Sequence, residues 1–145
     1  MFQLLVLILA VSPIAAVPPS RALWQFWNVL KCTIPDCKPI QQYNQYGCYC
    51  GVGGRGNPKD ELDRCCQIHD HCYEAANQIE NCSGLLEKPY INIYSYTCSG
   101  TSVTCKSDNT LCEMHICECD RQAAICFSNA PYNEENKNLD KNKFC

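Results

Sequence analysis

Residues 65–72 read C-C-Q-I-H-D-H-C and place a histidine next to a carboxylate between cysteines. Imidazole is the side chain that most readily takes and returns a proton near neutral pH, so His69 is a candidate general base. Just upstream, residues 46–54 read Y-G-C-Y-C-G-V-G-G. The two segments together offer a base, a metal-binding carboxylate at Asp70 and a loop of free backbone carbonyls.

A hydrolytic reaction at His69 would also need a nucleophile. The sequence has no G-x-S-x-G nucleophile elbow, and its cysteines are expected to be oxidised. A water molecule activated by His69 is the remaining simple choice, and it requires a stabiliser for the oxyanion that forms.

The glycine-rich loop can supply oxygen ligands for a cation. Its glycines at 51, 53 and 54 let the backbone turn tightly and point carbonyl oxygens inward. Asp70 projects about 100° around a helix from His69 and can face this loop. A carboxylate with several carbonyls suits Ca²⁺, whereas zinc prefers cysteine and histidine. The alternative is that these glycines only make turns.

The beginning of the chain predicts export. Residues 1–16 have the pattern of a signal peptide, with an apolar run over 4–11, a proline at 13 and alanines at 15 and 16. The run is shorter than the roughly 20 residues that span a bilayer. Residues 17–21 end in Arg21 and resemble a propeptide, the alternative being a simple mature tail. We expect a secreted, extracellular domain over 22–145.

Cysteine content and charge narrow the protein class further. The chain has 15 cysteines in 145 residues, which in an exported protein predicts one compact domain with a disulfide framework and one cysteine left over. It has 12 basic and 15 acidic residues, a net charge of −3. Cleavage after Arg21 leaves 11 basic against 15 acidic residues, or −4. This charge argues against strong reliance on anionic lipid, and no nucleic-acid partner is expected.

The expected architecture is mainly α, with two long helices, an N-terminal amphipathic helix and a small two-stranded β-wing. Apolar periodicity predicts helices over 22–32, 57–78 and 110–127. Residues 92–105 predict a short hairpin, and the polar tail over 133–143 is expected to be irregular.

Capping residues define where the long helices are expected to start. Asn57 can cap the second helix, with Pro58 at its first position. Thr110 and Glu113 have the spacing of a capping box at the start of the third helix.

Cysteine spacing predicts that the two long helices pack antiparallel. Cys65 and Cys72 are seven residues apart on one helix, and Cys119 and Cys126 are seven apart on the other. Antiparallel packing allows Cys65 to bond Cys126 and Cys72 to bond Cys119. The alternative is that the equal spacing is accidental.

This register places the second carboxylate of the candidate site. Asp120 falls opposite residue 71 and therefore close to His69. An aspartate that accepts a hydrogen bond from one ring nitrogen fixes the imidazole tautomer and leaves the other nitrogen as a base.

Three segments carry a family resemblance. Y-C-G-V-G-G over 49–54 is similar to a Y-C-G-x-G-G calcium loop, C-C-Q-I-H-D-H-C over 65–72 to a C-C-x-x-H-D-x-C active-site helix, and C-E-C-D-R-Q-A-A over 117–124 to a C-x-C-D-R-x-A-A segment. The chain resembles secreted calcium-dependent phospholipase A2 over 22–145. The insertion at 83–87 and the processing site at Arg21 resemble the pancreatic type, which is made as a proenzyme.

The resemblance implies calcium-dependent hydrolysis of the sn-2 ester of glycerophospholipids, which gives a fatty acid and a lysophospholipid. His69 would be the base that activates water, and Asp120 would orient it. Tyr73 and Tyr94 would hydrogen-bond Asp120. Without the family resemblance, ordinary amphipathic packing would be the favoured interpretation of these two tyrosines. Tyr90 resembles a residue that contacts the substrate phosphate.

The resemblance also implies how calcium is held. The ligands would be the carboxylate of Asp70 and the backbone carbonyls of Tyr49, Gly51 and Gly53. The oxyanion would be stabilised by Ca²⁺ and by the backbone N–H of Gly51.

Seven disulfides are implied by the same resemblance, and two of them are the rungs inferred above. The implied pairs are Cys32–Cys98, Cys48–Cys145, Cys50–Cys66, Cys65–Cys126, Cys72–Cys119, Cys82–Cys112 and Cys105–Cys117. Cys37 has no partner in that scheme. It is either a buried free thiol or the link to a second, disulfide-bonded chain; the protein is otherwise expected to be a monomer.

The first helix suggests a lipid-facing surface. Leu23, Phe26 and Leu30 resemble the wall of an acyl channel. Trp24 and Trp27 suit insertion at the interface of micelles or membranes, bound peripherally, since indole rings are amphipathic. The alternative is that one or both tryptophans belong to the core.

Two other functions compete with a lipolytic enzyme. One is a non-catalytic toxin subunit or receptor ligand on the same scaffold, which loss of His69 or Asp70 would indicate; both are present. The other is a zinc-binding module that uses cysteines with His69 and His71, which the export signal and the cysteine density disfavour. Asn81 begins a formal glycosylation sequon, but its middle residue, Cys82, is an implied disulfide cysteine.

Overall fold

The structure is a computed structural model that describes residues 21–80, 82 and 93–145. The expected signal peptide and all of the expected propeptide except Arg21 lie outside these residues. Tyr90, Asn81 and the insertion at 83–87 also lie outside them.

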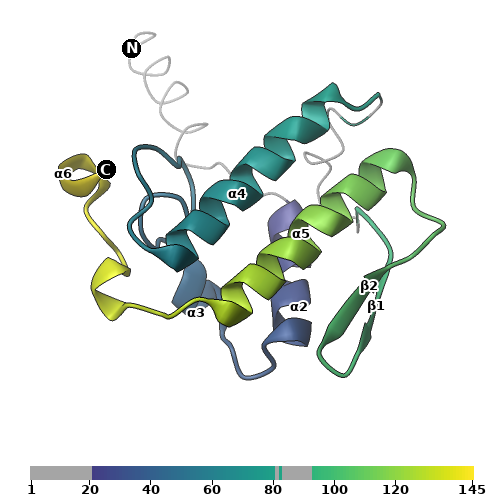
Figure 1. Ribbon diagram of the computed structural model, residues 1–145, viewed down its shortest axis with the longest axis horizontal. Helices are drawn as coiled ribbons and strands as arrows, with labels where there is room; N and C mark the ends of the chain where they lie inside the picture. The colour runs from purple at the N-terminus through teal and green to yellow at the C-terminus, as the bar shows by residue number, and fades with distance from the viewer. Residues whose placement is uncertain (1–20, 81, 83–92) are drawn as a thin grey trace, which may run out of the picture.

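The fold is mainly helical, as predicted, with two long helices side by side, an N-terminal helix behind them and a two-stranded sheet at one end (Figure 1). The described elements are α2 (Arg21–Thr33), α3 (Pro39–Tyr43), α4 (Glu61–Ala75), η1 (Ala76–Gln78), β1 (Tyr96–Ser99), β2 (Ser102–Cys105), α5 (Leu111–Asn129), η3 (Glu134–Asn136) and α6 (Lys141–Phe144). Within the described ranges, no helix combines the length and the apolar character that a membrane crossing needs.

Disulfides hold α4 and α5 antiparallel. Cys65 bonds Cys126 and Cys72 bonds Cys119, with Cα–Cα distances of 5.8 and 5.7 Å. The order of the partners is reversed between the helices, so the predicted antiparallel register is confirmed. The equal cysteine spacing is therefore not accidental.

Three of the other disulfides tie loops and the hairpin to this helix pair, one joins α2 to the hairpin, and one joins the glycine-rich loop to the last residue. All five pairings agree with those that the family resemblance implied: Cys32–Cys98, Cys48–Cys145, Cys50–Cys66, Cys82–Cys112 and Cys105–Cys117. The hairpin itself pairs Tyr96 with Cys105 and Ser99 with Ser102.

The start of α4 differs from the prediction. Asp60, not Asn57, caps the helix, because its carboxylate accepts a hydrogen bond of 2.8 Å from the Asp63 N–H. The Lys59 N–H donates to the Asp63 carboxylate at 2.7 Å. The backbone before Asp60 is therefore hydrogen-bonded to this side chain and does not form a helical turn. The α-helix ends at Ala75, and a 3₁₀ turn continues to Gln78.

The capping box at the start of α5 is confirmed. The Glu113 N–H donates to the Thr110 hydroxyl at 3.2 Å, and the Thr110 N–H donates to the Glu113 carboxylate at 2.8 Å. This helix runs to Asn129, two residues beyond the prediction. The tail is not wholly irregular, since it forms η3 and α6, and α3 was not predicted.

A buried carboxylate fastens the beginning of the glycine-rich loop to α4. Asp63 is fully buried and accepts from the N–H groups of Cys48 and Tyr49, both at 2.8 Å, as well as from Lys59. A buried carboxylate is tolerated when donors surround it in this way. The loop therefore leaves the core at a fixed point beside α4.

We expect Asp63→Asn to lower the free energy of unfolding by about 3 kcal/mol or more. The substitution removes the negative charge that accepts from three backbone N–H groups, and it replaces one acceptor oxygen with an NH₂ donor that faces those groups. Denaturant unfolding with the disulfides intact measures the change. Asp108→Asn, at an exposed position, is the control; equal stability losses in the two variants would contradict the role of Asp63.

Candidate functional site

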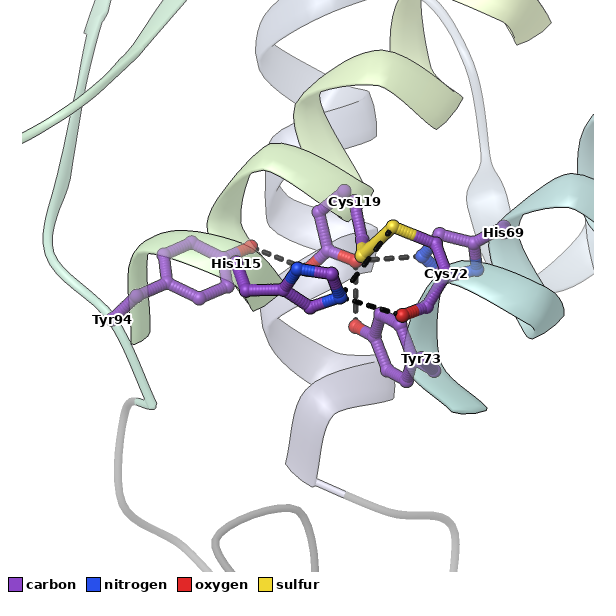
Figure 2. A network of polar contacts seen from close by, with 7 residues as sticks. His69, Cys72, Tyr73, Tyr94, His115 and Cys119 are labelled. Carbon is purple, nitrogen blue, oxygen red and sulfur yellow. Dashed lines mark hydrogen bonds and ion pairs between the residues drawn. A yellow bond between two sulfur atoms is a disulfide. The ribbon is translucent and has the colours of Figure 1, made fainter. Parts of the chain in front are cut away.

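His69 on α4 and Asp120 on α5 meet between the long helices (Figure 2). His69 Nε2 lies 2.7 Å from Asp120 Oδ1, and the Asp120 side chain is fully buried. The position predicted for Asp120 from the cysteine register is thus confirmed. A carboxylate can only accept, so Nε2 carries the hydrogen and Nδ1 is left as the unprotonated nitrogen.

Two tyrosines complete the surroundings of Asp120. The Tyr73 hydroxyl donates to Oδ1 at 2.6 Å, and the Tyr94 hydroxyl donates to Oδ2 at 2.5 Å. In Figure 2, dashed lines leave the hydroxyl groups of Tyr73 and Tyr94 toward the centre of the network. Burial, reinforced by the Asp120 charge, raises the pKa of Tyr73 and of Tyr94 far above the ordinary value, so both phenols remain donors. Their contact with Asp120 goes beyond the amphipathic packing that was the alternative.

Aromatic rings hold the imidazole in place. The Phe26 ring stacks on His69 with centroids 4.2 Å apart, and the Tyr73 ring lies 4.5 Å away. The His69 side chain keeps 12 % of its surface exposed. Its ring is therefore fixed by stacking and by Asp120 while a small opening to solvent remains.

Gln25 is a positioning residue that sequence reasoning missed. Its side chain is 5 % exposed and bridges to the segment that carries Tyr94. The amide NH₂ donates to the Tyr94 carbonyl at 2.6 Å, and the amide oxygen accepts from the N–H groups of Ile93 at 2.9 Å and Tyr94 at 3.3 Å. A glutamine beside Phe26 on the inward side of an amphipathic helix was the signal available in the sequence.

Asp70 faces the glycine-rich loop, as predicted, and the approach is close. A Cβ added to Gly54 would lie 2.9 Å from Asp70 Oδ2 and 2.5 Å from Tyr49 Cδ1, so only glycine fits there. Gly53, with φ of +74°, is in the region that favours glycine. Tyr49 closes the loop by donating its hydroxyl to the Gly56 carbonyl at 2.6 Å.

The Asp70 carboxylate is a candidate cation ligand on the side of α4 that faces the loop. Among the described residues it has no hydrogen-bond donor and no ion pair, and burial raises its pKa to about 6 against the opposing influence of His69. A partly buried carboxylate packed against a glycine-rich loop, whose backbone carbonyls can also be ligands, is a donor set that fits a hard cation such as Ca²⁺. The residues present therefore fit the calcium that the resemblance implied.

Another cluster near the site does not suit a metal. The possible ligand atoms of Cys72, Cys119 and His115 lie within 4.8 Å of one another, but the two cysteines form a disulfide. His115 Nε2 instead lies 2.7 Å from the Cys72 carbonyl oxygen. Figure 2 marks this contact with a dashed line. His71 is an exposed surface residue whose Nδ1 lies 3.2 Å from a carboxylate oxygen of Glu74.

The two tryptophans of α2 behave differently. Trp24 is 53 % exposed and remains available to a lipid surface, but Trp27 is only 8 % exposed. The burial of Trp27 agrees with the alternative that this residue belongs to the core, where its ring stacks on Phe26. On the same helix, Phe26 and Leu30 are buried and Leu23 is half-buried.

Cys37 lies beside the two tryptophans, at a cavity of about 310 Å³ between α2 and α3. Its thiol is 8 % exposed, donates weakly to the Leu30 carbonyl at 3.7 Å and has a pKa that burial raises. Disulfide exchange needs an accessible thiolate. Of the two interpretations of Cys37, the structure favours the buried free thiol.

Comparisons with known proteins match most of the chain to one family. The family model described as Phospholipase A2 matches residues 23–137. The chain is 58 % identical to a phospholipase A2 of Bos taurus over 122 residues, which cover 84 % of each chain. It is 57 % identical to one of Ovis aries over 124 residues, 86 % of this chain and all of the relative. Over 140 residues it is 54 % identical to one of Oryctolagus cuniculus, 97 % of each chain.

We expect Tyr94→Phe and Tyr73→Phe each to lower the free energy of unfolding by about 1–3 kcal/mol, since each removes a hydrogen bond to a buried carboxylate. Denaturant unfolding with intact disulfides measures the loss. Tyr96→Phe is the matched control, because Tyr96 lies next to Tyr94 and its hydroxyl has no hydrogen-bond partner in the described part of the chain. Losses no larger than that of the control would contradict the network.

Proposed function

Because this chain belongs to the phospholipase A2 family, we propose that His69 and Asp120 form its catalytic pair and that the loop around Gly51 holds its calcium. The chain is a phospholipase A2 enzyme, a hydrolase of the sn-2 ester of glycerophospholipids. The observation that carries the proposal is the 2.7 Å contact between His69 Nε2 and the buried Asp120 carboxylate.

The first step in the proposed mechanism is activation of water. Nδ1 of His69 accepts a proton from a water molecule whose oxygen attacks the sn-2 carbonyl carbon. Asp120 keeps the ring in the tautomer that makes this possible, and its negative charge stabilises the imidazolium that forms. Tyr73 and Tyr94 keep the carboxylate in place during the transfer.

Stabilisation of the oxyanion is assigned to the loop. The backbone N–H of Gly51 donates to the developing negative charge. Asp70 and the carbonyls of Tyr49, Gly51 and Gly53 would hold the calcium ion on which the family typically depends. When bound, calcium supplies Lewis-acid polarisation of the ester carbonyl.

Collapse of the intermediate returns the proton. His69, now protonated, donates it to the alkoxide oxygen of the leaving lysophospholipid. The ester bond breaks, a fatty acid is released, and Nδ1 is again ready as a base. Phe26, stacked on the ring, limits the access of bulk water to the pair.

The family acts at phospholipid interfaces, and we place the lipid-facing surface of this chain at α2. Trp24 is the exposed anchor, and Leu23, Phe26 and Leu30 are assigned to the acyl-chain wall. Zwitterionic or bile-salt-dispersed lipid fits the acidic net charge. Contact of Tyr90 with the substrate phosphate remains part of the proposal.

The family consists of disulfide-rich secreted proteins, and secretion of this chain is proposed on its N-terminal pattern. Removal of residues 1–16 and 17–21 would leave the mature domain over 22–145. A zymogen fits this organisation because α2, the proposed lipid-facing helix, begins where the propeptide would end.

We expect His69→Gln to reduce sn-2 hydrolysis of mixed micelles by about 10²–10⁴-fold in the presence of calcium, since it removes the base. A calcium chelator should abolish the activity of the unsubstituted protein. His71→Gln is the control, as His71 lies exposed on the same helix. Full activity of His69→Gln, or activity that withstands the chelator, would refute the mechanism.

Trp24→Ala should weaken vesicle binding by about 1.5–3 kcal/mol of apolar transfer energy, with little change in the hydrolysis of monomeric substrate. Equilibrium binding to zwitterionic vesicles measures the change, and Leu111→Ala, exposed at the far end of α5, is the control. Binding that rises steeply with the anionic lipid fraction would contradict the preference for zwitterionic or bile-salt-dispersed lipid.

A further inference from the structure

The last residues of the chain lie against the proposed calcium loop. We call residues 140–145 the C-terminal strap; it contains α6, which Figure 1 shows beside the loops that precede α4. Lys141 Nζ donates to the Val52 carbonyl at 2.8 Å. Arg55 donates from its guanidinium to Asn142 Oδ1 at 2.5 Å. Two successive residues of the strap thus bind both sides of the tip of the loop.

The strap is itself held in place by contacts near these bonds. Cys145 is bonded to Cys48, where the loop begins. A Cβ added to Gly56 would lie 2.2 Å from the Cys145 carbonyl oxygen, so the end of the chain packs directly on the end of the loop. The Lys59 ammonium lies 5.5 Å from the centre of the Phe144 ring. The strap is therefore a rigid support and not a loose tail.

The tip of the loop has few other supports. Residues 51–55 are all exposed. Among the described hydrogen bonds, the one that Lys141 donates to Val52 and the one that Arg55 donates to Asn142 are the only ones that join this tip to a segment outside residues 48–56. Val52 stands between Gly51 and Gly53, the two residues proposed to offer carbonyl ligands. Since a peptide group is planar, fixing the Val52 carbonyl also fixes the orientation of the Gly53 N–H.

We infer that Lys141 and Asn142 are positioning residues that order the calcium loop before the cation binds. This inference rests on the proposed function of the loop. A loop that is already ordered loses less conformational freedom on binding, so the affinity for the cation increases. The two residues touch neither the substrate nor His69, so their effect is on calcium affinity and on the mobility of the loop.

The charge of Lys141 and its hydrogen bond have opposite expected effects on calcium affinity. Removing a positive charge near a cation site should by itself tighten calcium binding. Removing the Lys141 hydrogen bond should weaken it. Lys143 lies two residues away in the same strap, is exposed, and contacts only the Phe144 ring with its ammonium group among the described contacts. Lys141→Met and Lys143→Met therefore remove the same charge, but only the first removes a bond to the loop.

The experiment measures calcium affinity by titration calorimetry and amide exchange of residues 51–55 without calcium. Lys141→Met and Asn142→Ala should each weaken calcium binding by roughly three- to tenfold, as expected for one hydrogen bond, and should speed exchange in the loop. Lys143→Met should bind calcium equally well or more tightly and exchange at the original rate.

Calcium affinity in Lys141→Met that equals or exceeds that of Lys143→Met, with unchanged exchange, would overturn the inference. Asn142→Ala truncates an exposed side chain without changing charge, so it decides the question if the lysine variant folds poorly. Failure of the unsubstituted protein to bind calcium would instead remove the proposed function of the loop. Normal binding with no effect of either variant would remove only the role of the strap.

Discussion

The buried carboxylate of Asp120 is the interaction on which the site depends. A charge removed from water costs several kcal/mol unless it is well paired, and Asp120 is fully buried. Its two oxygens accept from His69, Tyr73 and Tyr94. These donors come from α4 and from the segment before β1, so the fold around the carboxylate has to bring three parts of the chain together.

Helix α4 serves two different partners on adjacent faces. His69 turns toward α5 and Asp120, whereas Asp70 turns toward the glycine-rich loop. Asp63, two turns before Asp70, fastens the beginning of that same loop. The helix therefore carries the proposed base, the carboxylate proposed to bind calcium and the anchor of the loop. Its disulfides to α5 keep all three in register.

Helix α2 supports the site with buried side chains and also presents an exposed side chain to solvent. Gln25 positions the segment of Tyr94, Phe26 covers the imidazole, and Trp24 remains in solvent. Three neighbouring residues of one helix thus link the catalytic network to the proposed lipid surface. Successive side chains on a helix point about 100° apart, so neighbouring residues of α2 can face solvent, the Tyr94 segment and the imidazole.

The contact between His69 and Asp120 and much of the architecture could be predicted from the sequence alone. The spacing of Cys65, Cys72, Cys119 and Cys126 was enough to place Asp120 beside His69, because disulfides between antiparallel helices allow few registers. The capping box at Thr110 depends only on local hydrogen bonds, so it was also readable.

Other features were decided by tertiary contacts. The start of α4 moved to Asp60 because the Asp63 carboxylate captures backbone donors from the loop, a partnership between distant residues. Trp27 is part of the core, where its ring stacks on Phe26 beside the cavity between α2 and α3, and periodicity along one helix does not reveal this placement. The bridge from Gln25 to Tyr94 and the bond from Lys141 to Val52 join residues far apart in the chain. Local sequence determines which side chains can react and which helices form, whereas long-range packing determines which buried polar groups find partners, because those partners come from other segments.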